Sequence, residues 1–389
     1  MRGHVDEDVT EEELSGDGHL AGVELEENLV EESIKEPFDP ALIDVITRSM
    51  TVGLLLARLR RGVLDLAPDF QRRAGVWGDE AQSRLIESLL LRIPVPNLYA
   101  AETGEEGWSI VDGIQRLTTI ARFTEPDLVP QMKPLRLQGL EYLKAYDGCL
   151  YSELPPSLRT RIDETELLVH VIRSGTPEPV KFNIFARINT GGLPLTPQEL
   201  RHALIPGSAR SFLTRLAQSD AFLEATNHSV KPDRMADREM VLRFIAFFST
   251  ELDAYARGDL DAFLREAMIN LNGQSETRKA VIQKEFEAAL DLAEYIFGPQ
   301  AFRKRNRANP GRRLPINKAI FEALLVNLAR LDSQEKQQLR IRAKNVDASF
   351  VLLTQDERFF DSVSGGTGDR RKVRTRFTMI HEMLEEELA

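Results

Sequence analysis

Asp112, Gly113, Gln115 and Arg116 lie close together in the stretch SIVDGIQRLTTI, residues 109–120. An apolar run ends at Asp112-Gly113 and passes directly into a helical pattern, which predicts a strand, a tight turn and a helix start. The first turn of a helix has unpaired backbone N–H groups and a partial positive charge. Next to Gln115 and Arg116, such a turn can bind a phosphate or another anion.

The same residues also fit an ordinary turn between a strand and a helix. In that alternative, the Asp112 carboxylate caps the helix and Gly113 supplies a left-handed backbone conformation. The local pattern does not separate the two interpretations. The rest of the chain has to decide between them.

Two further groups of polar residues stand out from the apolar pattern. Gln71 and Arg72 follow a short predicted strand, and Asn189 and Gly191-Gly192 end a predicted helix. An Arg guanidinium binds phosphate oxygens through two parallel N–H groups, and Gly lets the backbone approach a ligand closely. Both groups can therefore contribute to an anion pocket together with the 112–116 turn.

A helix is expected to begin at Thr196, shortly after the second of these groups. Thr196 is a suitable N-cap, Pro197 occupies the first helical position, and Glu199 stands three residues after the cap, so three start rules agree. Glu199 and Arg201 add charged side chains to the same region.

Length and composition indicate an ordinary multidomain protein. The chain has 389 residues, of which 42% are hydrophobic and 29% charged, and this length favours two to three domains. No apolar run approaches the roughly 18 residues that span a membrane, and the acidic start does not resemble a secretory signal. Cys149 is the only cysteine, which excludes an intrachain disulfide and a cysteine zinc site. We therefore expect a cytoplasmic protein without a membrane partner.

Negative charge is concentrated at the N-terminus. Residues 1–36 contain thirteen Asp and Glu against Arg2 and Lys35, a balance of −11 that equals the net charge of the whole chain. An acidic segment without aromatic residues buries little apolar surface, so we expect residues 1–38 to be a disordered tail. Its role would be that of a solubilising leader, or of an autoinhibitory arm that mimics nucleic acid.

The remaining pattern predicts an α/β domain over residues 39–205. Helices are expected at 51–59 and 79–91, strands at 97–101 and 108–111, and a further strand at 134–137. The clearest strand is Glu166–Ile172, which is short and rich in β-branched and apolar residues. A small mixed sheet with helices follows from this order.

Residues 206–389 read as an all-α domain without a repeat period. Helices are expected at 208–218, 234–249, 260–271, 275–297, 318–331, 332–344 and 370–388. Two basic clusters interrupt them, one containing Arg303, Lys304 and Arg305 and the other Arg371 and Lys372. These cations suit contacts with a DNA backbone, although a charge run is also a common feature of a solvated surface.

Four motifs, in this order and at this spacing, resemble one known family. They read PDFQRRAGVW, LIESLLLRIPVPNLY, IVDGIQRLTTI and FARINTGGLPLTPQELRHAL, and they are similar to the ParB/sulfiredoxin-like N-terminal domain of GmrSD-type restriction endonucleases. The later FFDSVSGGTGDRRKVRTRF resembles the end of stand-alone members of that family. The resemblance implies a mixed α/β domain whose DGxQR motif takes part in nucleotide binding or hydrolysis, often in bacterial anti-phage defence.

The resemblance also assigns roles to individual residues. The DGxQR motif falls on Asp112, Gly113, Gln115 and Arg116, as catalytic and phosphate-binding groups. Arg116 would neutralise phosphate oxygens, while Asp112 would orient Arg116 or hold the water shell of a Mg²⁺ ion that accompanies a nucleoside triphosphate. No protein cluster of metal ligands is expected.

The outer motifs of the family supply the remaining nucleotide-binding residues. They fall on Gln71 and Arg72, where Arg72 would neutralise phosphate, and on Asn189, Gly192 and Glu199. Glu199 could position a water molecule, but its place in a capping box is a competing explanation.

Two departures from the family limit what the resemblance implies. Ile114 stands where the family usually has a second glutamine, which removes one polar contact and bears on hydrolysis. No His-rich, metal-spaced motif follows residue 205, since His228 and His381 are far apart, so the chain is expected to lack the His-Asn-His nuclease module.

Three hypotheses follow. The first is a nucleotide-binding and NTP-hydrolysing protein whose helical domain engages DNA or a partner effector protein. The second is a non-catalytic switch that holds a nucleotide or a DNA phosphate at the 112–116 turn. The third is a DNA nickase that uses the α/β domain itself. The sequence leaves open whether the chain forms a homo-oligomer.

Overall fold

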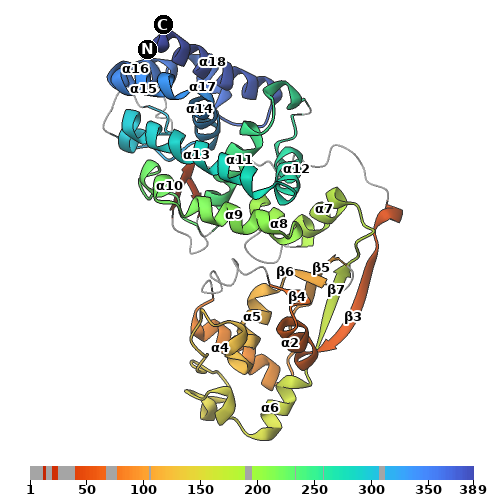
Figure 1. The fold of residues 1–389 in the computed structure, drawn as a ribbon. Helices are drawn as coiled ribbons and strands as arrows, with labels where there is room; N and C mark the ends of the chain where they lie inside the picture. Colours follow the sequence, from red (N-terminus) through yellow and green to blue (C-terminus); the bar gives the residue numbers. More distant parts are fainter. Residues whose placement is uncertain are drawn as a thin grey trace, which may run out of the picture. The chain divides into compact units, whose positions relative to one another are not determined.

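A computed structural model describes residues 12–14, 20–24, 40–66, 77–104, 107–188, 195–232, 234–256, 258–305 and 312–389. Contacts within the chain divide it into two compact units (Figure 1). The first, called the α/β unit below, comprises residues 36–195 and 202–206. The second, called the helical unit, comprises residues 1–35, 196–201 and 207–389. No helix in the described ranges is long and apolar enough to cross a membrane.

The α/β unit contains a five-stranded mixed sheet in the order β3-β7-β5-β6-β4. Its strands are β3 (Val45–Thr51), β4 (Leu64–Asp65), β5 (Leu98–Thr103), β6 (Gly107–Asp112) and β7 (Glu166–Ile172). β3 is antiparallel to β7, β7 is parallel to β5, β5 is antiparallel to β6, and β6 is parallel to β4. This small mixed sheet confirms the predicted α/β class.

The helices of the α/β unit surround this sheet. They are α2 (Val52–Arg60), α4 (Asp79–Leu90), α5 (Ile114–Thr124), α6 (Pro156–Asp163) and α7 (Glu178–Ile188), with α8 (Pro197–Leu204) shared by the two units. Short 3-10 turns occupy Pro40–Leu42, Pro126–Leu128, Lys144–Tyr146 and Tyr151–Glu153.

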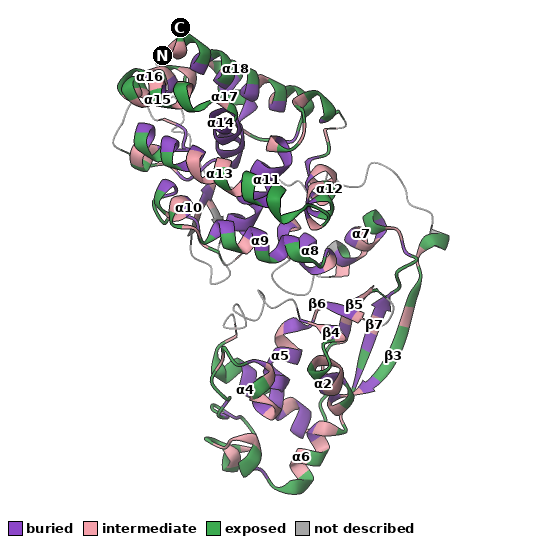
Figure 2. Ribbon diagram, in the orientation of Figure 1, coloured by how far each residue is buried: buried purple, intermediate pink, exposed green. Residues whose placement is uncertain are grey.

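Side chains alternate between the two faces of the sheet, as the pleat requires. In β7, Leu167, Val169 and Val171 are almost fully buried, whereas Leu168 is 45% exposed. Figure 2 shows this alternation along β7 and the buried sides of α4 and α5. One face of β7 therefore contributes to the core of the α/β unit.

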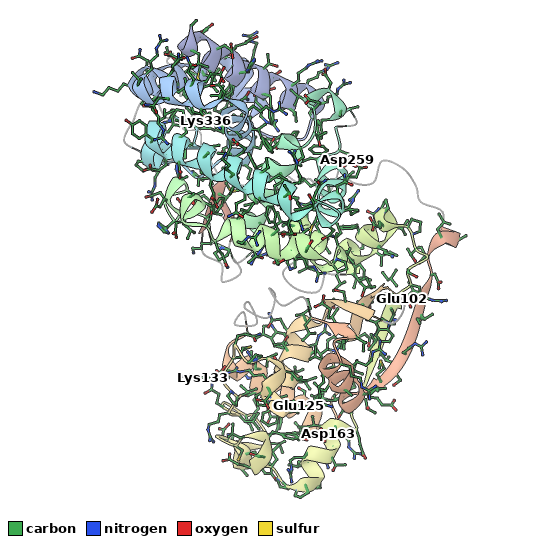
Figure 3. All side chains as sticks on the ribbon, in the orientation of Figure 1. Glu102, Glu125, Lys133, Asp163, Asp259 and Lys336 are labelled. Atoms are coloured by element: carbon green, nitrogen blue, oxygen red, sulfur yellow. The ribbon has the colours of Figure 1, made fainter. Side chains whose placement is uncertain are left out.

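Polar side-chain contacts also stabilise the same unit (Figure 3). Arg60 of α2 pairs with Glu125 at 2.6 Å. The Tyr151 hydroxyl donates a hydrogen bond of 2.9 Å to Asp163, and burial together with this carboxylate raises the pKa of Tyr151 to about 12. These contacts join segments that are distant in the sequence.

Two local predictions for this unit need correction. Residues 45–51 form the edge strand β3, where no strand was expected. The strand expected at 134–137 is absent: Leu135 and Leu137 are buried in an irregular segment, and the backbone N–H groups of these residues bond Arg122 O and Cys149 O. Burial of two alternating leucines imitates a strand in the sequence although no neighbouring strand pairs with them.

The helical unit is built around α14 (Lys318–Arg330), most of whose residues are buried (Figure 2). An aromatic cluster fills the space beside it, where Phe321 contacts Phe222 and Phe302, and Phe222 stacks on Phe286. The other helices are α9 (Ser208–Ala217), α10 (Asp220–Ala225), α11 (Ala236–Phe248), α12 (Leu260–Asn272), α13 (Glu276–Phe297), α15 (Ser333–Ile341), α16 (Ala343–Leu353), α17 (Glu357–Ser362) and α18 (Arg370–Leu388). The predicted all-α character of this part is confirmed.

Part of the acidic N-terminal segment is folded into the helical unit. The strands β1 (Glu12–Leu14) and β2 (Leu20–Glu24) pair with each other, and Val23 is fully buried beside Ile316. Glu24 pairs with Lys304 at 2.6 Å. The expectation of a disordered tail over residues 1–38 is therefore wrong for these eight described residues; the rest of that segment lies outside the described ranges.

Gly22 allows the acidic β1–β2 segment to pack closely against the rest of the helical unit. Its φ is +76°, and a Cβ atom at this position would lie 2.0 Å from Ser229 O. The Ile316 N–H bonds Gly22 O at 3.0 Å, and the Glu24 N–H bonds Ile316 O at 2.8 Å. Only glycine satisfies both the backbone conformation and the close approach.

Candidate functional site

The candidate site begins at the turn between β6 and α5. Gly113 is the N-cap of α5 with φ +92°, and no side chain among the described residues caps the helix. Asp112 therefore does not act as the cap that the ordinary-turn alternative required. Because the N-cap is a glycine, it has no side chain that could accept from the N–H groups of the first turn, and this favours anion binding at the helix start.

Asp112 and Arg116 form an ion pair across this first turn. Arg116 Nη2 lies 2.9 Å from Asp112 Oδ2, and the side chains are 11% and 31% exposed, respectively. Arg116 Nη1 is buried and has no hydrogen-bond partner within the described ranges. Asp112 thus holds the Arg116 guanidinium in place, while Nη1 of that guanidinium can still donate hydrogen bonds.

The two intervening residues face different surroundings. Ile114 is only 6% exposed, so this position belongs to the core rather than to the open side of the turn. Its burial gives a physical reason for an apolar residue where a glutamine was expected from the resemblance. Gln115 is partly buried in the same helical turn.

The strand next to β6 places an aromatic pair beside the turn. Tyr99 of β5 is the register partner of Asp112 and also of His170 on β7. The Tyr99 and His170 rings stack with centroids 4.9 Å apart. Sequence reasoning missed both residues, because only the strand order reveals that residues 99, 112 and 170 lie side by side.

Four predicted site residues cannot be placed. Gln71, Arg72, Asn189 and Gly192 lie outside the described residues. Their proposed contacts with phosphate therefore stay predictions.

Glu199 requires a correction, because its carboxylate has a structural role. The Thr196 N–H donates to Glu199 Oε2 at 2.7 Å, and the Glu199 N–H donates to Thr196 Oγ1 at 3.1 Å, which completes a capping box. Arg234 also pairs with Glu199 at 3.1 Å, and the side chain is only 6% exposed. These contacts favour the capping role over the water-positioning role.

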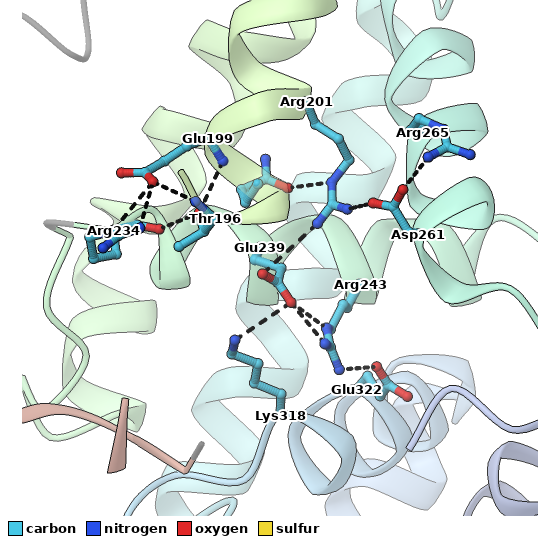
Figure 4. A network of polar contacts seen from close by, with 11 residues as sticks. Thr196, Glu199, Arg201, Arg234, Glu239, Arg243, Asp261, Arg265, Lys318 and Glu322 are labelled. Atoms are coloured by element: carbon cyan, nitrogen blue, oxygen red, sulfur yellow. Dashed lines mark hydrogen bonds and ion pairs between the residues drawn. The ribbon is translucent and has the colours of Figure 1, made fainter. Parts of the chain in front are cut away.

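The Arg201 side chain is likewise buried in the interior of the helical unit, where it forms ion pairs (Figure 4). Its guanidinium is 2% exposed, pairs with Asp261 and lies 3.9 Å from Glu239. Glu239 also contacts Arg243 at 2.8 Å and Lys318 at 3.6 Å. The predicted contribution of Arg201 to an anion pocket is therefore replaced by a place in a buried ionic network.

This network controls the ionisation of its central carboxylate. Burial acts to raise the pKa of Glu239, but Lys318, Arg243 and Arg201 outweigh it and hold the pKa at about 2. Arg243 continues the chain of charges to Glu322, which pairs with Arg376, and all three of these side chains are fully buried. The network connects α8, α11, α14 and α18.

In the first basic cluster, Arg303 and Lys304 are buried and Arg305 is partly buried. Arg303 is 2% exposed and donates to Ser229 Oγ and to the Leu314 carbonyl. Lys304 is 8% exposed and pairs with Glu24, while Arg305 pairs with Asp347 at 2.7 Å. The prediction that these three cations contact DNA is not supported, because their charges are used within the helical unit.

The second basic cluster lies at the surface. Arg371 is exposed, and Lys372 is partly exposed but donates to carbonyl groups at the end of α17 and to Asp361. Both residues line an open groove of about 810 Å³ between α17 and α18, together with Arg358 and Arg374. DNA contact by Arg371 and Lys372 stays a prediction.

No group of three or more His, Cys, Asp or Glu side chains within the described ranges could hold a metal ion. His228 lies exposed in the turn after α10, and His381 lies on α18 beside a cavity of about 300 Å³. The single carboxylate at the turn, Asp112, suits Mg²⁺ only through a water shell or alongside phosphate oxygens.

Comparison with known proteins gives one positive result. A model of the family described as "GmrSD restriction endonuclease, N-terminal domain" matches residues 52–206. No curated protein and no solved structure matches the chain. The match includes the sheet strands from β4 to β7, the Asp112–Arg116 turn and α8. Residues 52–206 are therefore similar to the N-terminal domain of the GmrSD restriction endonuclease family.

Proposed function

We propose that the Asp112–Arg116 turn binds the phosphate groups of a nucleoside triphosphate and that the protein acts in the restriction of foreign DNA. The start of α5 carries this proposal, since its N-cap, Gly113, has no side chain that could occupy the first-turn N–H groups and Arg116 lies directly beside them. The family match supports the DNA-restriction context.

The chemistry of the turn suits a polyphosphate. The N–H groups and the dipole of α5 favour negative charge at its start, and a partly buried guanidinium strengthens this preference. Gly113 brings the backbone to the ligand without a side chain in the way. The Asp112 carboxylate repels phosphate when free, but Arg116 neutralises it through Oδ2, which leaves Oδ1 for a water of a Mg²⁺ shell.

Binding and hydrolysis are separate proposals. For hydrolysis, Arg116 would stabilise negative charge on the transferred phosphoryl group, and a bound Mg²⁺ would supply further charge neutralisation. If no turnover accompanies binding, the same turn would serve as a nucleotide-dependent switch. Binding is the part that the geometry of the turn supports best.

The test combines equilibrium binding with phosphate release for ATP, GTP, CTP and UTP, with Mg²⁺ and with or without duplex DNA. Arg116→Ala is expected to weaken binding by about tenfold or more, because a charge-assisted contact is lost. Asp112→Ala is expected to lower turnover or binding, because Arg116 loses its orientation. Phosphate release that disappears in both variants identifies an NTPase, whereas binding without release identifies a switch.

Arg84→Ala provides a matched control. Arg84 pairs with Glu80 at 2.8 Å in the same i,i+4 geometry, but on the exposed surface of α4. This variant should bind and hydrolyse nucleotide like the wild type. If Arg116→Ala and Arg84→Ala behave alike, the assignment of the site is wrong.

A DNA nickase remains the second enzymatic candidate, because the family match points to restriction endonucleases. A supercoiled-plasmid assay with Mg²⁺ addresses it. Nicking that survives Asp112→Ala and Arg116→Ala would place that activity outside the turn.

A further inference from the structure

The surface that continues from the 112–116 turn across the sheet carries an aromatic pair. Asp112 of β6 lies opposite Tyr99 of β5, and Tyr99 lies opposite His170 of β7. Opposed residues in a sheet project from the same face. Because neighbouring strands are about 4.8 Å apart, the three residues span about 10 Å, which is comparable to the length of a nucleoside.

The close approach of β5 to the turn fixes this arrangement. A Cβ atom on Gly113 would lie 2.2 Å from Leu98 Cδ2, so the backbone of the turn is in direct contact with the residue before Tyr99. The phosphate-binding turn and the Tyr99–His170 pair therefore belong to one continuous part of the α/β unit.

His170 is held firmly although it is not buried. Thr47 Oγ1 lies 2.8 Å from His170 Nδ1, and Asn97 Nδ2 lies 3.0 Å from His170 Nε2. An amide Nδ2 can only donate, so Nε2 accepts and Nδ1 carries the proton that is donated to Thr47. Both ring nitrogens are therefore held, and the ring is stacked on Tyr99 at an interplanar angle of 27°.

The observations indicate a preformed planar surface rather than a packed core. Both rings are partly exposed, and Leu168, two residues before His170, is 45% exposed on the same face. A nucleobase offers a flat π-face that stacks on aromatic side chains, and this kind of contact tolerates different bases.

We propose that Tyr99 and His170 form the subsite for the base of a nucleotide whose phosphates occupy the Asp112–Arg116 turn. This inference rests on the proposed function, and it adds which part of the ligand is recognised and by which residues. Asn97 and Thr47 are positioning residues that keep the His170 ring parallel to Tyr99.

The experiment compares two ligands that share phosphates but differ in the base: a nucleoside triphosphate and inorganic tripolyphosphate. Tyr99→Ala and His170→Ala in the full chain are expected to raise the Kd for the nucleotide about tenfold and to leave the Kd for tripolyphosphate unchanged. Arg116→Ala is expected to raise both. Tyr142→Ala removes an exposed tyrosine, 73% accessible, and should change neither.

A spectroscopic measurement on the wild-type protein does not depend on how the variants fold. The His170 ring protons should shift on addition of nucleotide, because a stacked base adds a ring current, and should not shift with tripolyphosphate. Tyr99→Phe should keep nucleotide affinity, since the stacking surface is retained.

The outcomes separate this inference from the proposed function. In one outcome, Arg116→Ala weakens the binding of both ligands while Tyr99→Ala and His170→Ala leave the nucleotide affinity unchanged. In that case the assignment of the base subsite is wrong, and the assignment of the phosphate site is retained. If Arg116→Ala has no effect but the aromatic variants weaken the nucleotide, the phosphate assignment fails instead. If the wild type binds neither ligand, both are overturned.

Discussion

Gly113 and Leu98 approach each other so closely that a Cβ atom on Gly113 would lie 2.2 Å from Leu98 Cδ2. The same added Cβ would lie 3.3 Å from Arg116 Nη2. The glycine of the DGxQR motif is thus required by its left-handed backbone and by two neighbours, one in the core and one in the site.

Gly113→Ala should therefore both destabilise the α/β unit and remove nucleotide binding. We expect a loss of about 2–4 kcal/mol in the free energy of unfolding, from the left-handed conformation plus the clash. Gly62→Ala is the control, because Gly62 has φ +70° but no atom within 4 Å of an added Cβ. Gly62→Ala should lower the free energy of unfolding, measured by urea denaturation, by only about 1 kcal/mol. Equal losses in the two variants would show that the clash with Leu98 does not affect stability.

Glu239 should make the stability of the helical unit depend on acid. Its pKa in the folded chain is about 2, below the ordinary value of 4.5, so its stabilisation is fully present above pH 4.5 and is lost as the pH falls towards 2. Glu239→Gln leaves Arg201, Arg243 and Lys318 without this carboxylate and should cost about 3–5 kcal/mol at neutral pH.

Urea denaturation at several pH values measures both effects. Between pH 4.5 and pH 2, the stability of Glu239→Gln should fall less steeply than that of the wild type, by about one proton. Glu386→Gln, on the exposed surface of α18, should reproduce the wild-type curve. Parallel curves for Glu239→Gln and the wild type would contradict the network as described.

Glu24 should stabilise the helical unit although it belongs to the acidic N-terminal segment. Its carboxylate accepts hydrogen bonds from Lys304 and from Asn317 Nδ2, at 2.6 and 2.9 Å. Glu24→Ala should cost about 2 kcal/mol, because two buried donors lose their acceptor. Trp77 and Trp108, the two tryptophans, lie in the α/β unit, so far-UV circular dichroism should show a larger fall in midpoint than tryptophan fluorescence. An unchanged circular-dichroism midpoint would mean that the Glu24 contacts of β2 contribute nothing to the stability of the helical unit.

The exposed cations of α17 and α18 give a prediction about DNA. Arg358 and Arg371 line the open groove, so the variant carrying Arg358→Ala and Arg371→Ala should weaken binding to duplex DNA of any sequence. The slope of log K against log salt should decrease by about 2, one for each lost phosphate contact. Fluorescence anisotropy at several salt concentrations measures it. An equal loss in Arg84→Ala would indicate a general charge effect and not a DNA-binding surface.

Much of the fold could be predicted because the local signals were strong. The apolar run of Glu166–Ile172 matches β7 at both ends, and the Thr196-Pro197-Glu199 start coincides with α8. The Asp112–Arg116 pair joins the end of β6 to the first turn of α5, and its two residues are only four positions apart in the sequence. In each case the residues that interact are neighbours in the sequence.

The missed features depend on partners that are distant in the sequence. β3 is an edge strand with mostly exposed side chains, so its pattern lacks the alternation that identifies a strand. β2 is held by Ile316 and Lys304, and these contacts with distant residues cannot be predicted from the sequence of an acidic segment. Charge alone could not show that Arg303 and Lys304 are buried while Arg371 is exposed.

The candidate site in the α/β unit likewise depends on residues that are distant in the sequence. The turn was visible in the sequence, but the stacked pair of Tyr99 and His170 follows only from the strand order β3-β7-β5-β6-β4. Conversely, Glu199 has the residue type of a catalytic group and yet completes a capping box.

An NMR titration of the full chain, labelled with ¹⁵N, with a nucleoside triphosphate and Mg²⁺ tests phosphate binding at the start of α5 most directly. Phosphate binding at the start of α5 predicts that the backbone amides of Ile114, Gln115 and Arg116 show the largest shifts. At the same nucleotide concentration, Arg116→Ala should reduce these shifts, whereas Arg84→Ala should not. Shifts that are absent from these amides but present elsewhere in the chain would contradict phosphate binding at the start of α5.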